Sequence, residues 1–455
     1  MFFMLKKIAR TLWGDFESRV EVQKFGLLAS IFGLIIGSYW SMRIMKDSIF
    51  NAIIGMDYQP RAKWLSLAII IPIILIYNRL VSSYARHHVF YFLIGLYAII
   101  SFGFYLGFSS PVYGIENTVK DPYRLIGWAW YVFVESYGSL IVALFWAFTT
   151  DTTKPDSARR GFPMIAFFGQ LGNIFGPWLL KAKTLGFSNS APVVGICAVL
   201  MIITGLLFWF FMQVTPEEQL TGYEEKGHKE HQEEPGFFEG LKLLFSQPYL
   251  LGMFAIIMIY EIIVTIIDFH FKSSVAAVYT SELEVNNYLG NYGTWVGIIS
   301  MLCVLLGINS IQKWFGIRSS LLLLPVLVLG AVLYLKFNAQ SILIAFWIMV
   351  FSKAVNYALN QPTLKQLYIP TTKDTKYKAQ SWMEVFGGRG AKAAGSYVND
   401  FAGGFKVKYG IVEGINYFLT FSSIISLGLV GVWLVAAIYV ARVYTKAVKN
   451  NEVVC

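Results

Sequence analysis

Charged residues are scarce in this 455-residue chain. Asp, Glu, Lys and Arg make up 14% of it, whereas hydrophobic residues make up 56%. Soluble proteins carry about 25% charged residues. So little polar surface cannot cover a water-exposed globule of this size, which excludes an ordinary soluble protein. The surplus of apolar surface predicts instead a chain that faces lipid.

Cysteine and histidine are also few. The chain has three Cys and five His. Cys197, Cys303 and Cys455 follow no spacing pattern, so they predict neither a disulfide framework nor a metal site. The alternative from another class is a membrane-embedded transferase, which would need His and acids clustered near one interface. No His stands with acids at a catalytic spacing, which argues against it. A receptor or scaffold is a weaker alternative, because it would not need charges inside its spans.

A phosphate-binding loop of the form Gly-x-x-x-x-Gly-Lys-Ser/Thr is absent from the sequence. We therefore expect a protein that is not an enzyme and that uses no cofactor. Any transport across the membrane would then be driven by concentration gradients rather than by ATP hydrolysis.

Apolar stretches long enough to span a bilayer recur along the chain. A spanning helix needs roughly 20 mostly apolar residues. By this measure about twelve spans start near residues 25, 62, 88, 124, 161, 191, 248, 289, 319, 341, 380 and 410. We expect an all-α polytopic membrane protein in five parts. They are an interfacial segment (1–24), a six-helix bundle (25–214), a cytoplasmic linker (215–246), a second six-helix bundle (247–445) and a cytoplasmic tail (446–455).

The basic residues predict how the spans are oriented. The formal net charge is +10, which in a soluble protein would suggest a nucleic-acid partner. In a membrane protein, Lys and Arg instead mark the cytoplasmic loops. With the N-terminus inside, most basic loop residues fall on the cytoplasmic side, so we expect both termini there and no nucleic acid. Without a recognisable signal or transit peptide, we expect a bacterial inner membrane.

The two halves of the chain share a loop pattern. Thr149–Lys154 follows the fourth predicted span and Thr371–Lys376 follows the tenth, and each precedes a glycine-rich span. Parallel repeats of six spans are the architecture of the major facilitator fold, which holds its substrate near the midplane between the halves. The alternative is a chance match of two common loop compositions.

Charged residues occur inside several predicted spans, where each costs roughly 2.5–3.5 kcal/mol on insertion scales. Two basic pairs, each three residues apart and therefore on one helical face, are candidates to bind phosphate: Arg43 with Lys46, and Arg389 with Lys392. The acids Glu135 and Asp268 are candidates for charge pairing or coupling. A second group of candidates comprises Asp47, Glu261, His270, Lys272, Lys353 and Asn360. Alternatively, these charges only pair with one another or extend to the interface.

Four segments resemble one known family, the ATP:ADP antiporters of plastids and intracellular bacteria. These are Arg43–Asp47, Glu135–Ser139 with Phe145–Phe148, Ala158–Pro163, and a C-terminal group formed by Tyr368–Pro370, Lys376–Ala379 and Lys392–Gly395. The resemblance implies exchange of ADP for ATP, with Lys46, Glu135, Asp268 and Lys392 needed for transport. It implies a nucleotide and the bilayer as partners, and the oligomeric state stays open, a monomer included.

The sequence also departs from that family. Asp268 stands where the family usually has Glu, and Asn360–Lys365 replaces the family's Phe-Asp-Pro-x-Lys-Glu. These differences leave two alternatives open. One is a proton-coupled importer, in which Glu135, Asp268 or His270 would titrate. The other is a different substrate, such as GTP, NAD or another phosphorylated metabolite.

Overall fold

The computed structural model describes residues 16–220, 237–305, 310–337, 341–372, 383, 387–450 and 452–455. Helices dominate these residues, and no β-strand occurs in them. The predicted interfacial segment falls mostly outside this range, because residues 1–15 are not described.

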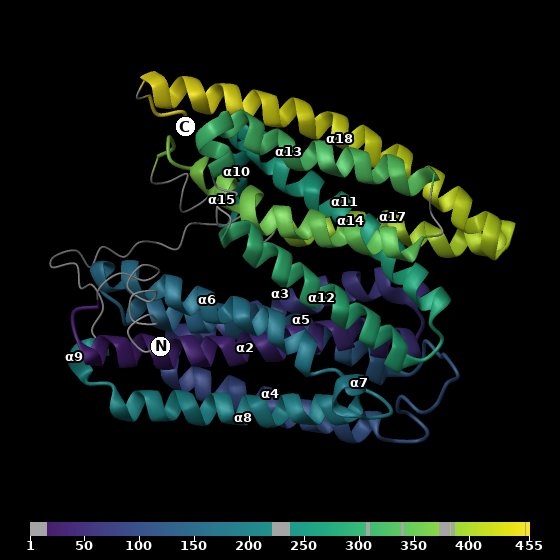
Figure 1. The fold of residues 1–455 in the computed structure, drawn as a ribbon, viewed down its shortest axis with the longest axis horizontal. Coiled ribbons are helices and arrows are strands. Elements are labelled where there is room, and N and C mark those ends of the chain that lie inside the picture. The colour runs from purple at the N-terminus through teal and green to yellow at the C-terminus, as the bar shows by residue number, and fades with distance from the viewer. Residues whose placement is uncertain are drawn as a thin grey trace. The chain divides into compact units, whose positions relative to one another are not determined.

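The long helices correspond one to one with the predicted spans (Figure 1). In chain order they are α2 (Arg19–Ile53), α3 (Gln59–Ser83), α4 (Arg86–Phe108), α5 (Leu125–Asp151), α6 (Pro155–Leu179), α8 (Ala191–Val214), α11 (Pro248–Val278), α12 (Glu282–Leu305), α13 (Ser310–Phe337), α14 (Ile342–Val355) continued by η2 (Asn356–Asn360) and α15 (Gln361–Gln366), α17 (Gly388–Tyr409) and α18 (Ile411–Asn450). Shorter elements are η1 (Met56–Tyr58), α7 (Ala182–Leu185), α9 (Glu217–Leu220) and α10 (Phe237–Ser246).

Ten of the helices in the described residues are long and apolar enough to cross a membrane. The remaining two long helices, α6 and α17, have 25 and 22 residues but are more polar. Large apolar side chains on the bundle surface, such as Leu75 (65% exposed) and Ile99 (73% exposed), would face lipid rather than water. The expected all-α polytopic membrane protein is confirmed.

Several helix ends differ from the sequence-based expectation for local reasons. α2 begins six residues before the predicted start, because the side chain of Ser18 accepts a hydrogen bond from the backbone N–H of Glu21 and caps the helix. The span expected from residue 380 is helical from Gly388, and most residues before it lie outside the described part. α18 runs to Asn450 and so continues into the predicted tail.

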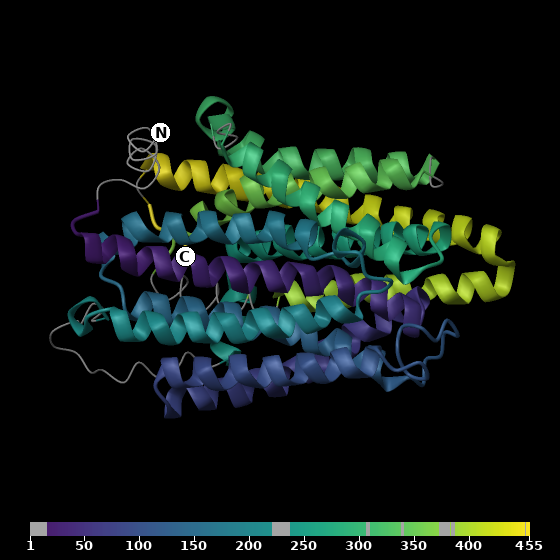
Figure 2. The ribbon, with the colours of Figure 1, turned by 60° about the horizontal axis from the view of Figure 1, so that its bottom comes forward.

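The chain separates into two compact units. Unit 1 comprises residues 1–55, 68–229 and 279–297, and unit 2 comprises residues 56–67, 230–278 and 298–455. The start of α3 therefore belongs to unit 2, and the first part of α12 belongs to unit 1. Within each unit the long helices run roughly alongside one another, as Figures 1 and 2 show.

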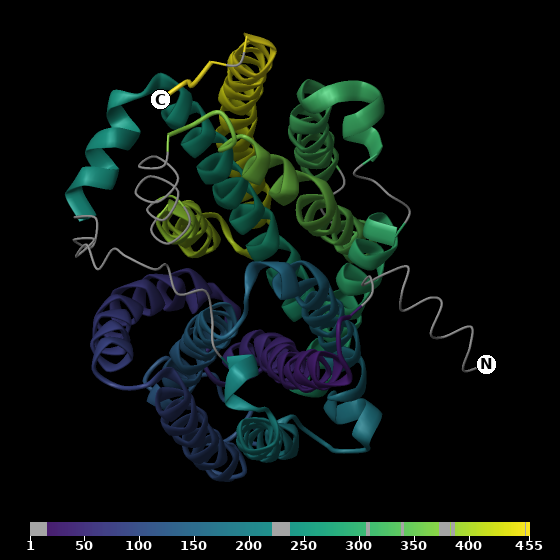
Figure 3. The ribbon, with the colours of Figure 1, turned by 90° about the vertical axis from the view of Figure 1, so that its left-hand side faces the viewer.

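The core of unit 1 is α2, which packs against α5, α6 and α8. Its contact with α6 is the most extensive, and Figure 3 looks nearly along the axes of these helices. Small residues make this contact close: a Cβ atom on Gly172 or Gly176 would collide with the backbone of Gly33 or Gly37. Helices without side chains at the crossing can bring their backbones together, as small-residue motifs do in membranes.

Unit 2 uses the same device between α11 and α17. A Cβ atom on Gly395 would lie 2.7 Å from the carbonyl oxygen of Ile262 and 2.9 Å from Cβ of Thr265. One turn further along α17, Asn399 donates a hydrogen bond of 3.1 Å to the carbonyl oxygen of Thr265. The first and fifth long helices thus cross in unit 1 as the seventh and eleventh do in unit 2, which agrees with the repeat predicted from the loops.

We expect Gly172→Ala to destabilise the protein by about 1–3 kcal/mol, because the added methyl group forces α2 and α6 apart. The melting temperature of the detergent-solubilised protein measures this loss. Gly95→Ala on α4 is the matched control, since no atom lies within 4 Å of its added Cβ. Equal melting temperatures for the two variants would contradict the close helix crossing.

Candidate functional site

The predicted basic pair of the first span lies in the interior of unit 1. Lys46 on α2 is only 4% exposed and forms an ion pair with Glu135 on α5. Its ammonium group also lies 4.2 Å from the ring centroid of Tyr131. The half-buried Arg43, one turn earlier, has its guanidinium 4.6 Å from the ring centroid of Trp40. The structure therefore brings Lys46 and Glu135 together.

Asp47 is also buried, at 3% exposure. It follows Lys46 on α2, so this short stretch of one apolar helix carries Arg43, Lys46 and Asp47 in succession. Aromatic faces next to the cations supply cation–π attraction without adding a competing negative charge.

In unit 2 three lysines lie around Asp268, the second acid predicted for charge pairing. The carboxylate of Asp268 on α11 lies 2.6 Å from Nζ of Lys272, 3.9 Å from Nζ of Lys353 and 4.0 Å from Nζ of Lys63. Lys272 is four residues along the same helix, whereas Lys353 comes from α14 and Lys63 from the start of α3. Asp268 and Lys272 thus form a local pair on α11, and α14 and α3 each add one lysine to it.

The basic pair of α17 lies next to a different acid. Nζ of Lys392 is 3.9 Å from Oε2 of Glu261 on α11, and the Lys392 side chain is 55% exposed. Arg389 is half-buried in the first turn of α17. Sequence reasoning assigned Glu135 and Asp268 as the acids that hold Lys46 and Lys392. The structure pairs Lys46 with Glu135, but it sets Glu261 beside Lys392 and gives Asp268 other lysines.

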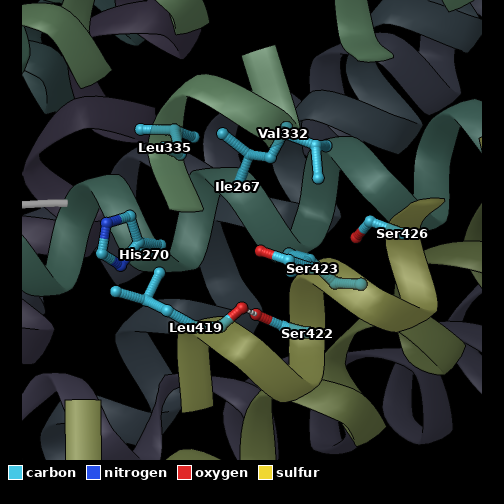
Figure 4. Close-up of a pocket in the computed structure, with 9 residues that line it drawn as sticks. Ile267, His270, Val332, Leu335, Leu419, Ser422, Ser423 and Ser426 are labelled. Atoms are coloured by element: carbon cyan, nitrogen blue, oxygen red, sulfur yellow. Dashed lines mark hydrogen bonds between the residues drawn. The ribbon is translucent and has the colours of Figure 1, made fainter. Parts of the chain in front are cut away.

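His270 lines a small pocket within unit 2 (Figure 4). The imidazole of α11 faces a stretch of α18 that carries serine hydroxyl groups, and apolar side chains of α13 close the other side. The lining residues are Ile266, Ile267, His270, Val332, Leu335, Leu419, Ser422, Ser423 and Ser426. The polar groups among these lining residues are this imidazole and the three serine hydroxyl groups.

Asn360 lies where the tenth span departs from α-helical geometry. Residues Asn356–Asn360 form a π-helical turn, and Asn360 donates a hydrogen bond of 2.8 Å to Oδ1 of Asn356. Pro362, which has no backbone N–H to donate, follows this turn. π-turns inside helices occur frequently at functional sites. Here the turn begins three residues after Lys353.

A buried carboxyl group that sequence analysis did not select lies in unit 1. Oε1 of Glu282 accepts hydrogen bonds from the hydroxyl groups of Ser48 (2.6 Å) and Ser190 (2.7 Å), and Oε2 accepts one from the backbone N–H of Ser190 (3.1 Å). Asn286 donates to the hydroxyl group of Ser48 at 3.3 Å. The first turn of α12 is thereby tied to α2. An acid in a first turn looks like an ordinary helix start, so no sequence signal distinguished it.

Lys63 was also missed. It falls at the beginning of a predicted span, where a lysine is typical of an interfacial anchor. Its contact with Asp268 depends on the packing of η1, just before α3, against α11, which the sequence pattern does not report. Among the described residues, no group of three or more His, Cys, Asp or Glu side chains could hold a metal ion.

The helices and their interior charges define a polytopic membrane transporter, and comparison with solved structures confirms its major-facilitator-like fold. A bacterial homolog of the human lysosomal transporter Spinster has a TM-score of 0.59 at 14% identity, with 95% of this chain and 99% of that chain covered. The nucleoside transporter NupG has a TM-score of 0.56 at 13% identity, with 92% and 99% covered. An auto-inhibited peptide transporter has a TM-score of 0.58 at 11% identity, with 93% and 97% covered.

The chain belongs to the TLC ATP/ADP transporter family, which matches residues 122–444. It is 25% identical to ADP,ATP carrier protein 2, chloroplastic, of Arabidopsis thaliana, covering 91% of this chain and 74% of that protein. It is 23% identical to ADP,ATP carrier protein 1 of Rickettsia conorii, with 98% of both covered. It is 25% identical to ADP,ATP carrier protein 1 of Chlamydia pneumoniae, with 95% and 94% covered. The family predicted from the sequence motifs is confirmed.

We expect Glu282→Ala to lower the free energy of unfolding by about 1–3 kcal/mol, because it leaves the buried hydroxyl groups of Ser48 and Ser190 without their acceptor. Thermal unfolding in detergent measures this change. Glu284→Ala is the matched control, since Glu284 is exposed on the same helix. A loss no greater than that of the control would show that the Glu282 hydrogen bonds do not stabilise unit 1.

Proposed function

We propose that this protein exchanges ATP for ADP across a membrane by alternating access. The observation that carries the proposal is the ion pair of Lys46 with Glu135 inside an apolar helical bundle. A buried cation of this kind is a functional feature by default, because a hydrophobic side chain would fit a purely structural role at lower free energy. Membership of the TLC ATP/ADP transporter family and the ADP,ATP carriers among its relatives support the nucleotide as substrate.

Arg43, Lys46, Arg389 and Lys392 are the residues we propose to bind the phosphate groups. A guanidinium can bind phosphate oxygens with two parallel hydrogen bonds, whereas an ammonium acts as a point charge. Each pair is spaced three residues apart on its helix, so both cations of a pair share one face.

The acids next to these lysines explain how each basic pair can exist within its own unit without substrate. Glu135 neutralises Lys46, and Glu261 stands 3.9 Å from Lys392. A nucleotide brings several negative charges, so its phosphates can take over the lysines from these carboxylates. Binding therefore replaces one set of ion pairs by another and does not create new buried charge.

This exchange of partners gives obligatory antiport a physical cause. Cations that have lost their phosphates must either regain their carboxylates or stay uncompensated in a medium of low dielectric constant, which costs several kcal/mol per ion. A carrier loaded with ATP or with ADP avoids that penalty on both sides of the membrane. We expect the empty carrier to reorient much more slowly than the loaded one.

We place the protein in a bacterial inner membrane with both termini in the cytoplasm. The support is the excess of Lys and Arg in the loops that this orientation places inside. The relatives from Rickettsia and Chlamydia are consistent with a bacterial setting.

Purified protein in liposomes should take up labelled ATP when the liposomes contain ADP, and only slowly when they are empty. Lys46→Ala and Lys392→Ala should each reduce this uptake by about a hundredfold or more, because each removes a charge-assisted contact to phosphate. Initial uptake rates measure the effect. Lys408→Ala, at an exposed position of α17, is the control and should transport normally.

Two outcomes would contradict the proposal. Wild-type rates in both Lys46→Ala and Lys392→Ala would remove the phosphate-binding assignment. Uptake that follows an imposed pH gradient and ignores internal ADP would identify a proton-coupled importer instead. Competition by GTP or NAD in the same assay identifies a substrate other than ATP.

A further inference from the structure

Three ammonium groups from three helices converge on one carboxylate in unit 2. Lys63, Lys272 and Lys353 all lie within 4.0 Å of Asp268. Their side chains are only 17%, 12% and 13% exposed, and that of Asp268 is 9% exposed. Removing an ammonium from water costs several kcal/mol, so three in one place need a compensating anion.

The three lysines lie at unequal distances from the carboxylate of Asp268. Lys272 is within hydrogen-bond distance at 2.6 Å, whereas Lys63 and Lys353 at 4.0 and 3.9 Å are attracted to the carboxylate without being hydrogen-bonded by it. A ligand that carries several negatively charged oxygens can contact all three ammonium groups at once, because they converge on one carboxylate.

The segment that carries Lys63 is held in place by two neighbouring ion pairs. Arg61 contacts Asp400 at 3.0 Å, and Asp57 accepts a hydrogen bond of 2.6 Å from Lys406. Both partners belong to α17, so η1 and the first turn of α3, which lie just before Lys63, are fastened to α17. Lys63 is thus positioned by contacts that are independent of Asp268.

We propose that Lys63, Lys272 and Lys353 form a polyphosphate-binding subsite in which Asp268 is the exchangeable counter-ion. The ligand class is a chain of two or more linked phosphates, as in a nucleoside di- or triphosphate. In the empty site Asp268 holds the lysines. In the loaded site phosphate oxygens accept hydrogen bonds from the ammonium groups, and Asp268 competes with the ligand for them. The identification of the physiological ligand as a nucleotide rests on the proposed function, the exchange of ATP for ADP.

The test is a titration of the solubilised protein with inorganic pyrophosphate, ATP and AMP at constant ionic strength, followed by calorimetry. Lys63→Gln should weaken pyrophosphate and ATP binding by about tenfold or more, because it removes a charge-assisted hydrogen bond. The affinity for AMP, which has a single phosphate, should fall by a smaller factor. Arg318→Gln, which changes an exposed cation of α13, is the control and should bind pyrophosphate as the wild type does.

Asp268→Asn separates binding from a structural role. Removing the competing carboxylate should tighten pyrophosphate binding, whereas a network that only stabilises the fold would lose affinity in Asp268→Asn and Lys63→Gln alike. Unchanged pyrophosphate affinity in Lys63→Gln, or weaker binding in Asp268→Asn, overturns the subsite. If Lys63→Gln does not fold, Lys353→Gln carries the same expectation.

The assay also separates this inference from the proposed function. If the wild-type protein exchanges ATP for ADP but the Lys63 and Asp268 variants do not bind pyrophosphate as expected, the proposed function stands and the subsite is refuted. Wild-type protein that binds pyrophosphate in the expected pattern but exchanges no ATP keeps the subsite and loses the nucleotide assignment. Wild-type protein that does not bind pyrophosphate overturns the subsite outright.

Discussion

The structure depends on compensating the cations that lie inside its apolar helical units. Lys46 is paired with Glu135, and Asp268 attracts three lysines. Each arrangement is stable only while an anion is present, because an isolated ammonium in a low-dielectric medium is unfavourable by several kcal/mol. A protein carboxylate and a substrate phosphate can both fill that role. In the mechanism that we propose, the same electrostatic requirement stabilises the empty carrier and selects an anionic substrate.

Close helix crossings hold these charges in register. Gly172 and Gly176 let α6 approach α2, the helix that carries Lys46. Gly395 lets α17, the helix that carries Lys392, approach α11. Glycine is needed at these crossings because any side chain would separate the backbones. One basic pair lies on the first helix of its crossing, α2, and the other lies on the second helix of its crossing, α17. The crossings therefore connect packing to function, since a shift of either helix would move a cation away from its acid.

Much of the fold could be predicted because it depends on local properties of the chain. Span length follows from bilayer thickness, and all twelve predicted spans correspond to long helices. The errors were also local: the Ser18 cap starts α2 early, and α18 continues into the predicted tail. The contacts of the candidate site residues were predicted less completely. Glu282 and Lys63 were missed because each looks ordinary in its own helix.

The sequence by itself determined that the chain crosses a membrane, that it carries paired cations on two helices and that it belongs to a nucleotide transporter family, because composition, i,i+3 spacing and motifs are all local. Only the tertiary structure decided which acid faces which cation. It placed Glu261 beside Lys392 and brought Lys63 to Asp268. The reason is physical: an ion pair between helices depends on how each helix is rotated and where it crosses its neighbour, and packing sets both of these across distant parts of the chain.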